Sequence, residues 1–273
     1  MSNKKINFTR NIGFGPIFAS FLCQDGQNFM KTDIRLPKQL GNCPLVDALI
    51  EIRFTSALDK NAVFGYIYGL LKDSYPSRVI NLPISQIPAQ VRDNDPNLKF
   101  KPLYRLEGKD TILQLGPDVI CLSSKIPYIG WDNLSRAAED IFERLSETGA
   151  IQRVLRLGHR YVNFFEGNIE DKLNMSVQFV NEYQTLNMQI RSEVCDGNFI
   201  NTLQYSNSAV YRPTPTSIEK KGSLIDIDTF RMYDDNYFLE NISKEINAAH
   251  SSEKALFYSL LKNSFILDLN PEY

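Results

Sequence analysis

Asp226 and Asp228 are a pair of carboxylates with the spacing of a metal site. Side chains two residues apart on a strand point to the same face, and hard cations bind paired carboxylate oxygens. The same stretch also alternates in the ordinary way, with Ile225 and Ile227 beside the two acids. This alternation favours a strand with buried isoleucines and solvated carboxylates. No metal is therefore expected, and Asp226 and Asp228 are kept as the alternative metal ligands.

Arg156 and Arg160 share one face of an expected strand, with Gly158 between them, and Glu51 and Arg53 share a face of an earlier strand. Charges on strands that form a core must be paired or solvated, so ion pairs between the two strands are the favoured interpretation. The alternative is an arginine-lined pocket for a carboxylate or phosphate ligand. In that case Gly158 would leave room for the ligand. Arg156, Arg160, Glu51 and Arg53 are thus candidate ligand-binding residues.

The sequence contains two histidines, and neither lies in a recognisable catalytic motif. His159 falls on the apolar face of its strand and His250 on the inner face of the last helix, positions typical of packed histidines. A ligand-binding role is kept for His250, in a cavity under that helix. The chain has no G-x-S-x-G nucleophile elbow and no glycine-rich phosphate loop. Catalytic residues stay unassigned, and a protein without enzymatic activity is favoured.

Hydrophobic periodicity predicts an α+β fold of mostly antiparallel strands covered by three main helices. Three helices are expected: one that follows Asp59 and ends at residue 72, one from Asp132 to about 148, and one over 236–263. Ser251 and Ser252 would kink or break the last of these. Strands are expected at 45–54, 99–107, 111–115, 119–123, 152–165, 175–183, 186–195, 198–206 and 223–231.

The order of these elements predicts a chain that is either one unit or two fused sub-domains. Residues 30–150 would form a β-α-β-β-β-α sub-domain, and 151–273 an antiparallel sheet with a long C-terminal helix. Near the N-terminus, Gly13, Gly15 and Pro16 interrupt an apolar run, which argues against a signal peptide.

Composition excludes several classes of protein. The 273 residues include 30 Lys and Arg against 32 Asp and Glu, a net charge of −2, which argues against a dedicated nucleic-acid binder. No window holds 18 uninterrupted apolar residues, so membrane association is not expected. The four cysteines lack the close pairs of a zinc site. No cofactor is therefore expected.

Five short motifs lie along the chain: P-L-V-D-A-L-I-E-I-R-F at 44–54, L-Q-L-G-P-D at 113–118, Y-I-G-W at 128–131, R-L-G-H-R-Y-V-N at 156–163 and K-A-L-F-Y at 254–258. Their order resembles a sporadically distributed family of uncharacterised prokaryotic proteins with a P-L-V-x-x-x-x-E-I-R-F motif and a central R-x-G-x-R-Y-x-N motif. The resemblance implies a cytoplasmic protein and carries over no catalytic residues. Similar proteins begin near the L-P-K segment at 36–38, which predicts that 1–29 is a disordered or non-native extension.

Together these observations predict a non-enzymatic binding component of a larger prokaryotic system, with another protein as its partner. The patchy distribution of the similar family is typical of mobile or defence-associated genes. One alternative is a metal-dependent phosphoryl-transfer enzyme, in which Asp226 and Asp228 hold the ion and Arg156 and Arg160 hold phosphate. Another alternative is a small-ligand-binding domain.

Overall fold

The computed structural model describes residues 36–177, 186–214 and 216–273. The expected extension at 1–29 and most of the expected strand at 175–183 lie outside these residues. Strands are β1 (Gln39–Leu40), β2 (Leu45–Thr55), β3 (Ile80–Asn81), β4 (Tyr104–Glu107), β5 (Thr111–Leu115), β6 (Val119–Ser124), β7 (Arg153–Glu166), β8 (Gln189–Asp196), β9 (Phe199–Tyr211), β10 (Lys220–Met232) and β11 (Pro271–Glu272). Helices are α1 (Lys60–Leu71), α2 (Ala89–Asn94), α3 (Trp131–Glu147), α4 (Tyr237–Glu240), α5 (Ile242–Leu260) and α6 (Asn263–Asp268).

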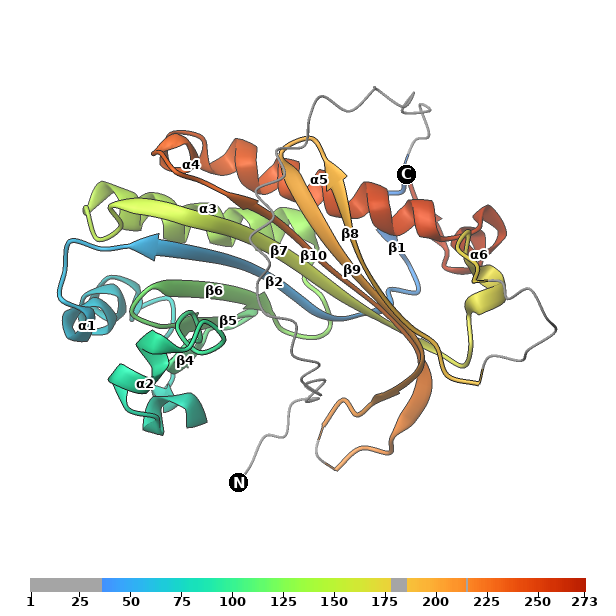
Figure 1. Ribbon diagram of the computed structural model, residues 1–273, viewed down its shortest axis with the longest axis horizontal. Coiled ribbons are helices and arrows are strands. Elements are labelled where there is room, and N and C mark those ends of the chain that lie inside the picture. Colours follow the sequence, from blue (N-terminus) through green and yellow to red (C-terminus); the bar gives the residue numbers. More distant parts are fainter. Residues whose placement is uncertain (1–35, 178–185, 215) are drawn as a thin grey trace.

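The architecture is α+β, as the periodicity predicted. Nine antiparallel strands form one sheet in the order β3-β4-β5-β6-β2-β7-β10-β9-β8, and β1 pairs with β11 in a separate two-stranded ribbon. Helices α3 and α5 run along the same side of this sheet (Figure 1), and α5 packs over β7 and β10. The three longest helices in the described residues, α1, α3 and α5, are the three that the sequence predicts.

The two halves of the chain share this single sheet. Strand β2, from the first half, pairs with β7, from the second half, and Ile50 lies opposite His159 in that register. Strand β7 then pairs with β10, which places Thr229 on the other side of His159. The larger apolar core likewise draws on both halves, from Ile50 to Ile246. The boundary near residue 150 thus separates two parts of one sheet.

Alternation gives the central strands two different faces. On β2 the side chains of Ala48, Ile50, Ile52 and Phe54 are buried against the helices. We call this side the helical face and the side that carries Glu51 the polar face. On β7 a register shift in the pairing with β2, between Arg53 and Phe54, keeps Val154 on the helical face. From there onward, alternate residues of β7 stay on the face predicted for them.

The last helical segment differs from the expected single helix. It divides into α4, α5 and α6, with its first break at Asn241, and α5 continues through Ser251 and Ser252. The hydroxyl of Ser251 donates to the carbonyl of Asn247 one turn earlier, so the serine bonds within the helix without interrupting it. Ser252 is buried and accepts a hydrogen bond from Asn201 on β9.

Two other elements begin at residues different from those predicted, and each difference has a local cause. The strand expected from residue 99 begins only at Tyr104, because the amide of Lys99 donates to the carbonyl of Asp95 in a turn. Helix α3 begins at Trp131 rather than after Asp132, since Gly130 takes a positive φ of 87° that sets the chain into the helix. Asp59 does cap α1, as predicted, by accepting from the amide of Asn61.

Candidate functional site

Six charged side chains meet on the polar face of the three central strands. Strands β2, β7 and β10 each supply two of them at alternate or i, i+4 positions, so all six project from one side of the sheet. We call this group the charge ladder; its members are Glu51, Arg53, Arg156, Arg160, Asp226 and Asp228. The sequence analysis named all six.

Arg156 is the centre of the charge ladder. Its Nη1 donates to Glu51 Oε1 at 3.1 Å and its Nη2 to Asp228 Oδ2 at 2.7 Å, so one guanidinium joins β2, β7 and β10. Glu51 also accepts from Arg53 Nε at 2.9 Å. The Arg156 side chain is only 9% exposed, and such a buried cation needs compensating charges. The geometry is that of the structural ion pairs that the sequence favoured.

Arg160 and Asp226 form the second part of the ladder. The Arg160 Nε and Nη2 donate to the two carboxylate oxygens of Asp226 at 2.7 and 2.5 Å, a bidentate pair. Asp226 holds the pKa of Arg160 above its ordinary value, mainly through these hydrogen bonds. Both oxygens of Asp226 are thus engaged by a cation. Within the described residues, no third His, Cys, Asp or Glu joins Asp226 and Asp228 at ligating distance.

Gly158 has a different role from the one considered in the sequence. A Cβ on this residue would lie 2.2 Å from Arg156 Nη1. The space above the glycine is therefore filled by the guanidinium of Arg156, whose Nη1 bonds to Glu51. It is not left open for a ligand between the two arginines.

Aromatic and sulfur-containing side chains surround the charge ladder. The guanidinium of Arg53 lies 4.8 Å from the ring centroid of Phe100, and that of Arg156 lies 4.7 Å from the ring of Phe230. Both distances are in the range of cation–π contacts. Met232 follows Phe230 on the same face of β10 and is 62% exposed. The polar face thus combines arginine, phenylalanine and methionine.

A second group of polar side chains lies on the opposite, helical face. His159 on β7 and His250 and Glu253 on α5 place one potential ligand atom each within 4.8 Å of one another. We call these three residues the histidine cluster. Its members include both histidines of the chain, whose ring centroids are 5.4 Å apart. The sequence placed each histidine correctly on an inner face.

Aromatic rings enclose the histidine cluster. Trp131, at the start of α3, stacks on His250 with centroids 3.9 Å apart, and its Nε1 donates to Asn247. Tyr161 lies beside His159 on β7, and its hydroxyl bonds to that of Tyr128 at 2.5 Å. The apolar surroundings leave few partners for the polar atoms. Both His159 nitrogens, His250 Nδ1 and Glu253 Oε1 are buried without a hydrogen-bond partner in the described part of the chain.

Burial shifts the protonation of every member of the cluster. Desolvation raises the pKa of Glu253 to about 8, with a smaller opposing effect of Lys254. It lowers the pKa of His250 to about 3, aided by the same lysine. The pKa of His159 falls well below its ordinary value through desolvation and then through proximity to His250. At neutral pH the two imidazoles are therefore uncharged, and most of the Glu253 carboxyl is protonated.

Sequence reasoning missed Glu253 and the meeting of the two histidines. One signal was present, because His250 and Glu253 are three residues apart and so share a face of a helix. The contact of α5 with β7 follows from tertiary packing, so the sequence could not place His159 against this pair.

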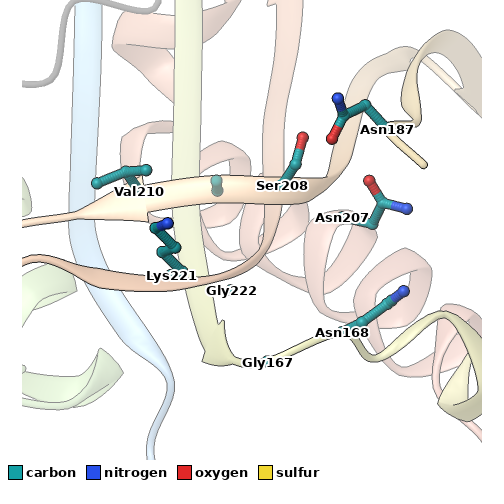
Figure 2. Close-up of a pocket in the computed structure, with 9 residues that line it drawn as sticks. Gly167, Asn168, Asn187, Asn207, Ser208, Val210, Lys221 and Gly222 are labelled. Atoms are coloured by element: carbon teal, nitrogen blue, oxygen red, sulfur yellow. The ribbon is translucent and has the colours of Figure 1, made fainter.

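A third feature is an open cleft of about 420 Å³ where β7 ends beside β9 and β10. Figure 2 shows Asn168, Asn187 and Asn207 at one end of the cleft, and Val210 and Lys221 at the other. Asn207 is committed to the fold, since its side chain accepts from the amide of Met188 and donates to Glu170. Apart from Lys221 the residues that line the cleft are uncharged, and none of them belongs to the charge ladder or the histidine cluster.

Comparison with known proteins adds no family to these observations. Neither the family models nor the curated proteins gave a match to this chain. Among the described residues, no helix combines the length and the apolar character needed to cross a membrane.

Proposed function

We propose that this protein is a non-enzymatic binding component of a larger prokaryotic system, and that it binds a partner protein through the polar face of its sheet. The observation that carries the proposal is the charge ladder. Its three arginines and three acids neutralise one another through direct hydrogen bonds. Such a surface is charged but balanced, and it is held in place by three strands of a rigid sheet.

The composition around the charge ladder also supports this function. Arginine, phenylalanine and methionine are enriched at protein–protein interfaces, and arginines with aromatic neighbours are frequent in their energetic centres. Arg53 and Arg160 keep 33% and 40% of their side chains exposed, so their outer atoms can still reach a partner. Met232 adds an exposed apolar side chain at the edge of this group.

The phosphoryl-transfer alternative has less support. It needs Asp226 and Asp228 free for a cation and Arg156 and Arg160 free for phosphate. The two sets of residues do meet on one face, as that hypothesis required, but they bind each other. A cation bound by the two aspartates would have to displace both guanidiniums. The buried Arg156 would then lose the partners that compensate its charge.

Co-purification from the native host tests the proposal. The full-length protein carries an affinity tag, and retained proteins are identified by mass spectrometry. Met232→Asp, within the polar face, is compared with Leu267→Asp on α6, a residue with a similar exposure of 65% against 62%. We expect one stoichiometric partner with the wild-type protein and with Leu267→Asp, and at least about a tenfold loss with Met232→Asp, because a charge would be desolvated in the interface.

Either of two results would overturn the proposal. One is equal retention of the partner by both variants, which would place its binding site elsewhere. The other is stoichiometric recovery of a divalent metal or a nucleotide that is lost in Asp226→Asn, which would favour the enzyme. Circular dichroism of each variant verifies that the sheet is intact.

A further inference from the structure

The histidine cluster has the composition and placement of a metal site. His250 and Glu253 are three residues apart on α5 and so project from one side of the helix toward β7. His159 comes from the centre of the sheet, opposite Thr229 on one side and Ile50 on the other. One ligand atom from each residue lies within 4.8 Å of the others. The site thus joins two elements of the fold, as metal sites built between packed elements do.

The polar atoms of the cluster are buried and unsatisfied. His159 is 1% exposed and Glu253 2% exposed, and neither nitrogen of His159 has a hydrogen-bond partner in the described residues. Glu253 Oε1 and His250 Nδ1 likewise have no hydrogen-bond partner among the described residues. A buried polar group without a partner destabilises the folded state, so several in one place call for a ligand that accepts their lone pairs.

We propose that His159, His250 and Glu253 bind one divalent transition-metal ion, with Zn²⁺ as the best fit. Two imidazoles and one carboxylate are a common set of three protein ligands for Zn²⁺, with a fourth position left for water or another molecule. Imidazole selects Zn²⁺ and its transition-metal neighbours over Mg²⁺ and Ca²⁺, which prefer sites built from oxygen alone. The site lies on the helical face, so this inference is independent of the proposed function of the polar face.

The geometry requires only a small adjustment. Ligand atoms at about 2.0–2.2 Å from a tetrahedral Zn²⁺ lie roughly 3.4 Å from one another. The three side chains therefore need to approach by little more than an ångström, a change that side-chain rotations can supply. His250 is partly exposed beneath Trp131, whereas His159 and Glu253 are buried. An ion would enter beside this stacked pair of rings.

Tryptophan fluorescence can report ion binding directly. The chain has a single tryptophan, Trp131, and this residue stacks on one of the proposed ligands. Co²⁺ can replace Zn²⁺ at such sites and quenches nearby indole fluorescence. The full-length protein, without a histidine tag and treated with chelator, is titrated with Co²⁺ while the fluorescence of Trp131 is recorded. We expect saturation at one Co²⁺ per chain, reversal by Zn²⁺, and no response to Mg²⁺.

Two glutamate variants make the test specific. Glu253→Gln removes a proposed ligand at nearly constant volume, and we expect it to weaken Co²⁺ binding by about 100-fold or more, at least as much as losing an outer-shell partner. Glu240→Gln is the matched control, because Glu240 lies exposed on α4 outside the cluster. This variant should bind Co²⁺ with the affinity of the wild type. His159→Gln should behave like Glu253→Gln if it folds.

Two outcomes would overturn the proposal. One is a wild-type protein that gives no saturable quenching by Co²⁺ and contains no transition metal by elemental analysis when purified from its host. The other is a Glu253→Gln variant that folds and binds Co²⁺ as tightly as Glu240→Gln does. Neither outcome affects the proposed partner, because the tests of the polar face use Met232 and Leu267.

Discussion

The indole of Trp131 stacks on the imidazole of His250, with ring centroids 3.9 Å apart and ring planes only 7° from parallel. Trp131 opens α3, whereas His250 lies within α5, so this contact joins two helices above the sheet (Figure 1). The indole Nε1 also donates to Asn247 of α5 at 3.0 Å. One residue thus fixes the start of α3 and covers the histidine cluster.

We expect Trp131→Ala to lower the free energy of unfolding by roughly 2–3 kcal/mol, somewhat less than for a fully buried aromatic residue. Trp131→Phe keeps a ring over His250 and loses only the hydrogen bond to Asn247, so it should cost about 1 kcal/mol. Denaturant unfolding followed by circular dichroism measures both. Equal losses for the two variants would show that stacking on His250 contributes nothing.

Arg156 should be the most sensitive member of the charge ladder. Arg156→Ala leaves Glu51 and Asp228 without their shared cation, and we expect a loss of roughly 2–3 kcal/mol, reduced from the fully buried case because both acids are partly exposed. Arg191→Ala is the control, because Arg191 pairs with Glu193 on β8 and is 61% exposed. It should change stability by less than about 0.5 kcal/mol. Urea unfolding measures the loss of stability in both variants, and losses of similar size would contradict the prediction.

Gly158→Ala tests where the Arg156 side chain lies. The added methyl group would meet the guanidinium at 2.2 Å, so the single substitution should cost about 1–3 kcal/mol. The same substitution in an Arg156→Ala background should cost almost nothing, since the space is then vacant. A double-mutant cycle measures the coupling between the two residues. Additive losses would mean that Arg156 does not cross Gly158.

The histidine cluster predicts how the stability of the metal-free protein varies with pH. The pKa of Glu253 rises from 4.5 to about 8 on folding, which favours the folded state at low pH, and this advantage disappears as pH rises through 8. The pKa of His250 falls from 6.5 to about 3, so its contribution is present above pH 6.5 and is lost toward pH 3. The pKa of His159 moves in the same direction as that of His250.

The combined contribution of the histidine cluster to stability should therefore be highest near pH 6.5. Between pH 6.5 and 8, Glu253 is the one member of the histidine cluster whose contribution changes, and it should lower the free energy of unfolding by about 1.4 kcal/mol per pH unit. Glu253→Gln cannot ionise and should remove this fall, whereas Glu240→Gln should retain it. Urea unfolding in the presence of chelator at several pH values gives the slopes. A wild-type protein with constant stability over this interval would contradict the assignment of Glu253.

Local pattern was sufficient to predict much of this fold. The alternation of Ile50 and Ile52 with Glu51 and Arg53 assigned β2 and both of its faces, because a strand has a period of two. The same rule placed Arg156 and Arg160 together on β7. Periodicity did not predict the break at Asn241, because a helical period continues across a single residue that leaves the helix.

The candidate sites show the limit of such patterns. The ion pairs that join different strands of the charge ladder link residues far apart in the sequence, so only the register of β2, β7 and β10 could identify these partners. The sequence named these six residues and favoured ion pairs between the strands of Glu51 and Arg156, but it could not say which acid each arginine binds. For the histidine cluster it supplied two residues on separate inner faces and missed Glu253, whose burial depends on how α5 packs against β7.

The pairing of β2 with β7 has a consequence for synthesis on the ribosome. Strand β2 lies near the start of the described chain, but one of its two neighbours is made only after residue 153. Until then β2 can pair with β6 alone, and its other edge exposes backbone groups able to associate with other chains. Helix α5, which packs over β7 and β10, is made only after both of these strands, so the first half of the chain stays partly open until the second half has been synthesised. A chain terminated near residue 150 should therefore aggregate rather than fold as a shorter protein, and supplying residues 151–273 separately should rescue its solubility.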